Sequence, residues 1–444
     1  MLIRPIIVLI VVIIILWIVK KIINRTKFYK YLGYLGLRLQ EFILKKIVYL
    51  GYVVNPEEAN KASGASVAGN KMQWNVVKHL SQYEDIEMIC VTISPLAVFP
   101  HDKKIFYKEN EEELVPEVKS IRIGFCNLPI IKQFWQIVSV YSVAKKIIKE
   151  MNADVIFTFN LFPQIGVPMR WLKKKFPHLE TVCLLADLPI DDNTNRKGLS
   201  VFLRKLFEKS TWKSMKTCDK YIVLNKEVIR KYLSNKEYIV IDGGVSDDDV
   251  KKYEDYVAKN EEYSIMYCGA LTEYNGILNL LQAMQLVKDE DIYLDIYGGG
   301  YLEDVVRSAA QQRRNIRYHG RVDNQTIIKK QREAWLLINP RVINDPIAEV
   351  TFPSKTFEYM LSGTPVLTTR LNGYSEEYEG KMIFTESDSA EKIAEGIEKV
   401  KRMGKEELQS ISCEAKKFVV EKRCWSVQSK KIVDFIEGNG PKGE

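Results

Sequence analysis

The strongest constraint on the fold is an alternation that begins after residue 50, where short β-branched runs are separated by segments with helical periodicity. Parallel strands need a crossover, usually a helix, to reach the next strand, so this alternation predicts a parallel α/β architecture. The expected strands of the first series are Lys46–Val54, Ile86–Ile93, Ser120–Gly124, Val155–Thr158, Thr181–Leu185 and Tyr221–Leu224. Between them lie helical patterns such as Met72–Leu80, with apolar residues four positions apart.

A second series of strands and helices follows a turn at Asp242-Gly243-Gly244 and a charged stretch that we interpret as the interdomain linker. Its expected strands are Ser264–Tyr267, Ile292–Tyr297, Ile316–His319, Trp335–Ile338, Pro365–Thr368 and Met382–Phe384. Its expected helices are Ile277–Val287, Leu302–Gln311, Asn324–Glu333, Ser354–Leu361, Ala390–Arg402 and one long helix from Glu406 to Glu437. Since 444 residues exceed one ordinary core, we expect two domains.

The N-terminus departs from this globular pattern. Residues from Pro5 to Val19 are apolar without a charge, and they could span a thin bilayer if the flanking Arg4 and Lys20 snorkel. No small-residue cleavage site follows, so residues 1–25 are predicted to be an uncleaved anchor rather than a signal peptide. Positive charge is heavier after this segment, which predicts a single-pass protein of the inner (cytoplasmic) membrane with its domains in the cytoplasm.

The basic, aromatic segment over residues 26–50 leaves two interpretations open. Its tyrosines, leucines and lysines suit a helix that lies at the membrane surface. They equally suit a connecting helix that packs on the first domain.

Composition excludes several classes of protein. Seven scattered cysteines without a C-x-x-C pair suit a reducing compartment and argue against a structural zinc site. The four histidines show no metal-ligand spacing, so no bound metal is expected. The net charge of +8 is compatible with anionic lipids or phosphorylated substrates. Because zinc-finger and RNA-binding signatures are absent from the sequence, no nucleic-acid partner is expected.

Glycines follow the strands of the second series, at the end of a parallel sheet where ligands bind. Gly269 comes after the first strand, Gly298-Gly299-Gly300 after the second, and Arg321 after the third. Glycine lets the backbone approach a ligand closely, and an arginine here could contact a diphosphate. Each feature alone also fits an ordinary turn or a helix cap.

The most specific junction runs from Phe352 to Leu367. Pro353 and Ser354 are expected to open a helix on which Lys355 and Glu358 share one face. A lysine here matches a diphosphate, and a carboxylate one turn deeper matches two vicinal ribose hydroxyls. A plain salt bridge between these two side chains is the structural alternative.

The block from Phe352 to Val366 resembles the donor-site helix of family-four retaining glycosyltransferases. Cys268–Leu271, Gly298–Gly300 and His319–Val322 follow the order of motifs in that family. The resemblance covers residues 51–435 in layout and is specific from about residue 260 to 375. It implies a GT-B fold, in which two Rossmann-like, doubly wound α/β domains face a cleft. It also implies retaining transfer from a nucleotide-sugar, without a metal or another cofactor.

The resemblance also implies a domain division. The acceptor domain would span residues 51–243 and the nucleotide-sugar domain residues 244–417. Residues 418–444 would form a helix that returns to the first domain.

The sequence departs from the family's pattern at two places. The family's paired glutamates are eight residues apart, but Val350 stands eight positions before Glu358 and Glu349 is one place off. Ala270 and Asn275 stand near the positions of the family's usual arginine and lysine. Neutralisation of the diphosphate would then fall to Lys355, Arg321 or Arg341.

The resemblance extends to one segment of the first domain, and a second candidate stands there at a strand end. Gly64, Ser66, Gly69 and Asn70 precede a helix and resemble the family's loop that faces the acceptor and the donor phosphate; a flexible surface loop is the alternative. Asp187 follows the strand Thr181–Leu185 and is expected to position the acceptor hydroxyl or the sugar.

These observations predict a hexosyltransferase that acts on a lipid-linked glycan at the cytoplasmic face of the membrane, as in capsule or exopolysaccharide biosynthesis. Two alternatives stay open. One is a nucleotide-sugar 2-epimerase of similar fold, and the other is a non-catalytic scaffold in polysaccharide assembly. Nucleotide-sugar binding would separate the scaffold from the enzymes.

Overall fold

The structure, a computed structural model, describes residues 44–62, 64, 66–189, 199–255, 257–345 and 351–439. The predicted anchor at residues 1–25 and residues 26–43 of the segment after it lie outside these ranges. Within these ranges, no helix has both the length and the hydropathy needed to cross a bilayer.

The N-terminal domain is built on a sheet whose strand order is β10-β9-β8-β7-β1-β2-β5-β4. All neighbours pair in parallel except β4, which runs antiparallel to β5 at the edge. The strands are β1 (Lys45–Gly51), β2 (Ile86–Thr92), β4 (Asn110–Val115), β5 (Val118–Arg122), β7 (Val155–Phe159), β8 (Glu180–Leu185), β9 (Lys220–Val223) and β10 (Glu237–Val240). The short strands β3 (Phe106–Tyr107) and β6 (Phe125–Cys126) pair separately. None of the expected strands covers β3, β4, β6 or β10.

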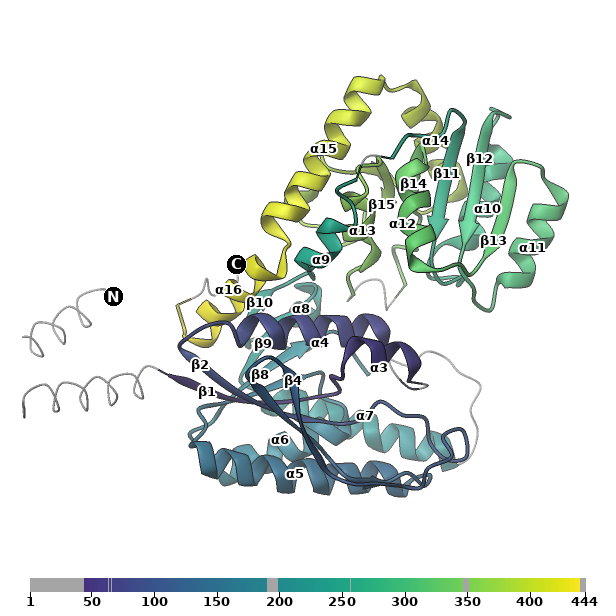
Figure 1. Cartoon of the computed structure of the whole chain (residues 1–444). Coiled ribbons are helices and arrows are strands. Elements are labelled where there is room, and N and C mark those ends of the chain that lie inside the picture. Colours follow the sequence, from purple (N-terminus) through teal and green to yellow (C-terminus); the bar gives the residue numbers. More distant parts are fainter. Residues whose placement is uncertain are drawn as a thin grey trace, which may run out of the picture.

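Helices cover both faces of this sheet (Figure 1). One face carries α5 (Ile131–Met151), α6 (Pro163–Lys175) and α7 (Leu199–Thr217), which pack side by side. The other carries α3 (Pro56–Lys61), α4 (Val67–Leu80) and the C-terminal α16 (Trp425–Ile436). The buried clusters show the same layering, because Val140 and Ile147 of α5 join one core and Val76 of α4 joins the other with Ile432 of α16.

The start of this domain corrects the predicted boundary at residue 51. Residues 45–50, which we assigned to the juxtamembrane segment, form most of β1, between β2 and β7. Ile47, Val48, Tyr49 and Leu50 are fully buried. A strand paired on both sides and buried on both faces is the centre of the sheet, so the domain begins by Lys45.

The C-terminal domain has six parallel strands in the order β13-β12-β11-β14-β15-β16. They are β11 (Tyr263–Cys268), β12 (Ile292–Tyr297), β13 (Ile316–Gly320), β14 (Leu336–Asn339), β15 (Val366–Thr369) and β16 (Ile383–Thr385). Their helices are α10 (Ile277–Leu286), α11 (Glu303–Gln312), α12 (Asn324–Glu333), α13 (Lys355–Leu361) and α14 (Ala390–Arg402). The strand order reverses between β11 and β14, which is where ligands bind in doubly wound sheets.

The predicted long helix over residues 406–437 is wrong: the chain forms α15 (Lys405–Lys422) and α16, which are separated at Arg423 and Cys424. The break lies where the interdomain linker passes. Val245 N donates to Arg423 O, and Trp425 N donates to Val245 O, both over 2.9 Å. These two bonds redirect the chain, and Trp425 is buried in the core of the N-terminal domain.

The linker is held by a buried ion pair. Arg423 Nε lies 3.0 Å from Asp242 Oδ1, and both side chains are almost completely buried. Tyr378 Oη also donates to Asp242 Oδ2, over 2.5 Å. Burial raises the pKa of Asp242, and the attraction of Arg423 opposes that shift. One carboxylate thereby joins the linker, the C-terminal crossing and the second domain.

Candidate functional site

The glycine-rich loops after β11 and β12 pack directly against each other. A Cβ atom on Gly298 would lie 1.9 Å from Gly269 O, and one on Gly300 would lie 2.4 Å from Leu271 O. Gly298 also has a φ of +128°, which L residues rarely adopt. The packing of the two loops therefore explains Gly298 and Gly300 without any ligand.

Gly299 has a different neighbour, the predicted donor-site arginine. A Cβ atom at this position would lie 2.5 Å from Arg321 Nε. Arg321 follows β13 and is exposed, so its guanidinium lies on the surface of the glycine loop. The structure thus brings Gly299 and Arg321 together, as a diphosphate site would require.

Lys355 lies at the end of β11. Its Nζ donates to Cys268 O over 2.6 Å, and a Cβ atom on Gly269 would lie 3.3 Å from that Nζ. Tyr359, one turn further along α13, accepts a hydrogen bond of 2.9 Å from Cys268 N. These contacts fasten α13 to β11 and place the ammonium group of Lys355 beside the Gly269 loop.

Glu358 faces the other domain. Its carboxylate lies 3.9 Å from Lys71 Nζ of α4, and Lys71 also pairs with Asp249 at 3.0 Å. Among the ion pairs of the described residues, none joins Lys355 to Glu358, so the alternative of a plain salt bridge is not what the structure shows. Lys71 was missed in the sequence, because nothing local in α4 indicates that this helix faces α13.

Arg341 follows β14, at the reversal of the strand order. It is 7% exposed, its guanidinium lies over the ring of Tyr274 at 5.3 Å, and its Nε has no hydrogen-bond partner among the described residues. Burial lowers the pKa of Arg341. The turn in front of it is tight, since a Cβ atom on Gly276 would lie 1.7 Å from Pro340 O.

The remaining predicted donor residues are less informative. Pro353 is buried before α13, and Ser354 is exposed at its N-cap position without a capping hydrogen bond. Glu349, the possible first glutamate of the family's pair, lies outside the described residues.

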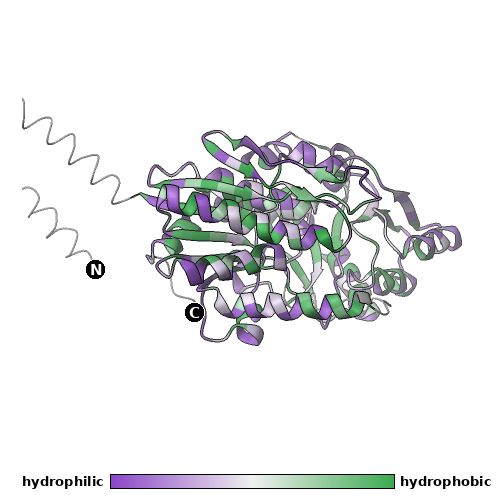
Figure 2. Ribbon diagram, turned by 90° about the horizontal axis from the view of Figure 1, so that it is seen from below, coloured by the Kyte–Doolittle hydropathy of each residue, from purple (hydrophilic) through white to green (hydrophobic). Residues whose placement is uncertain are grey.

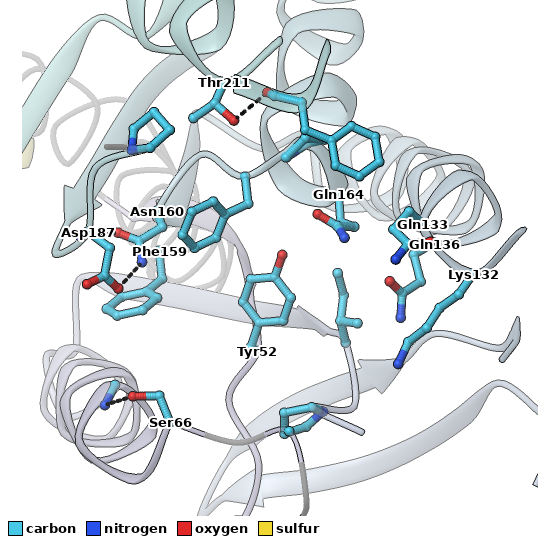
Figure 3. A pocket seen from close by; sticks show the side chains of 18 of the residues that line it. Tyr52, Ser66, Lys132, Gln133, Gln136, Phe159, Asn160, Gln164, Asp187 and Thr211 are labelled. Carbon is cyan, nitrogen blue, oxygen red and sulfur yellow. Dashed lines mark hydrogen bonds between the residues drawn. The ribbon is translucent and has the colours of Figure 1, made fainter. Parts of the chain in front are cut away.

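An open cavity of about 860 Å³ lies in the N-terminal domain, at the carboxyl ends of β1, β2, β7 and β8 (Figure 3). It is lined by all the residues predicted there from the sequence, namely Gly64, Ser66, Gly69, Asn70 and Asp187. Segments far apart in the chain thus form one site.

The loop residues differ in what they can offer to a ligand. Ser66 is the N-cap of α4, and its Oγ accepts a hydrogen bond of 3.2 Å from Gly69 N. Asn70 is buried and bonds through its side chain to both N and O of Val54. These two bonds hold the segment that follows β1, while Asn70 also lines the cavity.

Asp187 is held by Asn160, whose Nδ2 donates to Asp187 Oδ2 over 3.0 Å (Figure 3). Asn160 Oδ1 accepts from the backbone N–H groups of Ala186 and Asp187. Burial raises the pKa of Asp187, and the hydrogen bond from Asn160 opposes that shift. Asn160 was missed, although it directly follows β7 and the criterion of strand ends would have found it.

The rest of the cavity combines amides with aromatic rings. Gln133, Gln136 and Gln164 approach from the first turns of α5 and α6, opposite Tyr52 and Phe159 (Figure 3). Amide groups can donate and accept hydrogen bonds with hydroxyls, and aromatic faces suit apolar C–H surfaces. The lining therefore suits a polyhydroxylated ligand such as a sugar.

The structure also bears on metal binding. In the described ranges, no three His, Cys, Asp or Glu side chains converge in a way that could hold a metal ion.

Residues 262–402 match the family described as glycosyl transferases group 1. No curated protein sequence is significantly similar to the chain.

Solved structures resemble most of the chain. Sucrose-phosphate synthase from Thermosynechococcus elongatus is 14% identical, with 89% of this chain and 99% of that chain covered and a TM-score of 0.63. HepE from Anabaena, in complex with UDP, is 13% identical, with coverages of 88% and 100% and a TM-score of 0.58. WaaG, a glycosyltransferase involved in lipopolysaccharide biosynthesis, is 15% identical, with coverages of 88% and 100% and a TM-score of 0.54. At these identities the likeness shows the fold, which is GT-B.

Proposed function

We propose that this protein is a retaining, metal-independent glycosyltransferase that moves a hexosyl group from a nucleotide-sugar to a hydroxyl of a lipid-linked glycan. One observation carries the proposal. In the C-terminal domain Lys355 lies against the Gly269 loop and Arg321 against Gly299, and Glu358 stands on α13 with Lys355 and faces the other domain. The other domain holds an amide-lined cavity with Asp187.

The donor would lie over the glycine loops. Lys355 and Arg321 lie against Gly269 and Gly299, so both cations can reach a diphosphate held there. Arg341 Nε, which has no hydrogen-bond partner among the described residues, could supply a further donor. Glu358, which faces α4 of the other domain, would accept hydrogen bonds from two ribose hydroxyls. HepE was solved with UDP, which makes UDP-sugars the first donors to test.

The acceptor sugar would occupy the N-terminal cavity, with its hydroxyl near Asp187. For retention, that hydroxyl attacks the anomeric carbon on the face from which the diphosphate leaves. A carbon–oxygen bond forms as the bond to the diphosphate breaks, and the leaving diphosphate oxygen takes the proton. The protein contributes orientation and charge stabilisation of the leaving group.

The lipid linkage rests on the predicted anchor over residues 1–25. A catalytic body tethered to the cytoplasmic face meets acceptors that are confined to the same membrane. Capsule or exopolysaccharide biosynthesis is the setting that fits such an acceptor.

Calorimetry on the detergent-purified full chain tests the proposal with a panel of UDP- and GDP-sugars. Glu358→Ala should weaken donor binding by roughly 100-fold or more, because two hydrogen bonds to a charged group contribute about 1.5–3 kcal/mol each. Glu395→Ala, which removes an exposed carboxylate from α14 of the same domain, is the matched control and should bind as the wild type does.

The outcomes of this titration separate the alternatives. Saturable binding that is lost in Glu358→Ala but kept in Glu395→Ala supports the donor site. The sugar nucleotides that bind then identify the nucleotide base of the donor. A folded wild type that binds no nucleotide-sugar would favour the non-catalytic scaffold. Equal binding by both variants would place the ribose elsewhere.

The pH dependence of turnover tests the role of Asp187. Because the pKa of Asp187 is raised, the loss of activity on lowering the pH should begin at a higher pH than an ordinary aspartate, with its pKa near 4, would give. Asn160→Gly removes the hydrogen bond that lowers the pKa of Asp187, so the acidic limb of the pH–activity profile should move to higher pH. Glycine is chosen because residue 160 has a positive φ. Asp187→Asn should abolish the limb and reduce turnover by roughly 10- to 100-fold. If the acidic limb of the pH–activity profile is unchanged in both variants, a group other than Asp187 causes it.

A further inference from the structure

The layer formed by α5, α6 and α7 has an unusual outer face, turned away from the sheet and from the second domain (Figure 1). Its exposed side chains follow one stripe along each helix, at spacings of three and four residues. Figure 2 views the molecule from this side and shows hydrophilic and hydrophobic residues along the helices nearest the viewer. From this face we infer that the α5–α6–α7 layer docks on the surface of an anionic phospholipid bilayer.

The first turns of α5 and α7 supply the apolar part of the face. Large side chains are exposed there by between 46% and 65%, namely Ile131, Phe134, Trp135 and Val138 of α5 with Phe202 and Leu206 of α7. Exposed single hydrophobics are ordinary, but four of these side chains follow one stripe at the start of α5, and the other two lie on α7, on the far side of α6 in the same layer. Such a concentration in one helix layer marks an interaction surface. Phenylalanine, tryptophan and aliphatic side chains on the apolar part of a helix surface are typical of insertion at a membrane interface.

Further along the same stripes the exposed residues become cationic. The three helices together contain thirteen lysines and arginines and two acidic residues, Glu150 and Glu208. Exposed lysines continue the stripes, namely Lys146, Lys149, Lys174, Lys175, Lys205, Lys209, Lys213 and Lys216. Among the described side chains of these helices, Glu150 is the only exposed acid. Such a surface complements anionic headgroups.

A bilayer explains the combination better than another macromolecule does. Lysine is depleted in protein–protein interfaces, whereas it is common beside inserted apolar residues at membranes. Nucleic acid would attract the lysines but would leave the six apolar side chains in water. The predicted span ends near Val19, and the chain from there to β1 can reach roughly 80 Å when extended, so the tether permits this orientation.

The face adjoins the acceptor cavity. Gln133 and Gln136 line the cavity from α5 and flank the exposed Phe134 and Trp135 in the sequence. Phe207 lines the cavity from α7, beside the exposed Leu206. Docking would therefore bring the cavity mouth to the headgroup layer. This consequence rests on the proposed function, because it concerns delivery of a lipid-linked acceptor, but the docking itself does not.

Fluorescence depth measurement on the full chain in nanodiscs tests the inference without any sugar. An NBD probe is attached at Val138→Cys or Phe202→Cys in a Cys413→Ser background, whose other cysteines are buried or half-buried. Val305→Cys, on α11 of the other domain and also exposed, is the matched control site. In discs with phosphatidylglycerol, lipid-borne nitroxides should quench the probes at 138 and 202 but not at 305. In discs of phosphatidylcholine alone, quenching should be weaker.

Charge reversal supplies the second arm. Each lysine near an anionic surface strengthens binding by about fivefold, so Lys205→Glu/Lys209→Glu/Lys213→Glu should lower the docking constant by roughly 100-fold or more. The control Lys399→Glu/Lys405→Glu/Lys417→Glu, at exposed lysines of α14 and α15, should leave quenching unchanged.

Several results would overturn the inference. These are equal quenching at all three sites, no quenching at 138 and 202, or failure of the chain to enter the discs. Probes shielded from aqueous iodide but untouched by lipid quenchers would show a protein partner or a second copy instead. Since the assay contains no nucleotide-sugar, its failure is distinct from failure of the donor titration.

Discussion

Replacing Lys355 with methionine is expected to lower turnover by roughly 10²- to 10³-fold, the usual effect of removing one group that stabilises developing negative charge. Lys355 Nζ lies beside the Gly269 loop, where the diphosphate would depart. Donor affinity should fall less, because the charge on the leaving oxygen develops only in the transition state. Release of nucleoside diphosphate in the presence of a lipid-linked glycan measures the effect.

Two controls accompany this variant. Lys399→Met removes an exposed lysine from α14 of the same domain and should retain full turnover. Thermal unfolding of Lys355→Met should show only a small change, since one lost hydrogen bond to Cys268 contributes about 1 kcal/mol. Turnover within threefold of the wild type would mean that Lys355 does not stabilise the leaving diphosphate and that Arg321 or Arg341 does so instead.

Arg423→Met is expected to cause the largest loss of stability. It leaves the Asp242 carboxylate buried without its cation, and breaking a buried pair costs about 3–5 kcal/mol, which corresponds to a fall in Tm of roughly 5–15 °C. Asp242→Asn/Arg423→Met removes the stranded charge and should recover much of the loss. Arg307→Met breaks an exposed pair with Glu303 and should change Tm little.

The pH dependence of this loss has a definite sign. Without the attraction of Arg423, the pKa of Asp242 rises further above its ordinary value. A carboxyl whose pKa is raised by folding destabilises the fold once the pH exceeds its unfolded value, fully so above the folded pKa. The loss in Arg423→Met should therefore shrink as the pH is lowered, as calorimetric scans at several pH values would show. A loss that does not vary with pH would mean that the stranded carboxylate is not its cause.

The sequence predicted most of the fold because strand and helix periods are local properties of the chain. The strand Ile292–Tyr297 and the helices Asn324–Glu333 and Ala390–Arg402 agree with the structure residue for residue. The antiparallel edge strand β4 escaped prediction, since the polar run Asn110–Val115 is half solvated and lacks the β-branched pattern. The break between α15 and α16 escaped as well, because its cause is the linker, which lies far earlier in the chain.

For the site, the sequence alone was enough to select most candidate residues: Gly269, Gly299, Arg321 and Asp187 follow strands, and Lys355 and Glu358 stand on the helix that begins after Pro353. Strand ends are set by local patterning, and parallel topology gathers them at one edge of each sheet. The contacts of each side chain at that edge depend on tertiary packing. Asn160 donates a hydrogen bond to Asp187, and Lys71 faces Glu358 from the other domain. Asn70 accepts a hydrogen bond from the backbone N–H of Val54. These pairings depend on packing between segments distant in sequence, which no local pattern encodes.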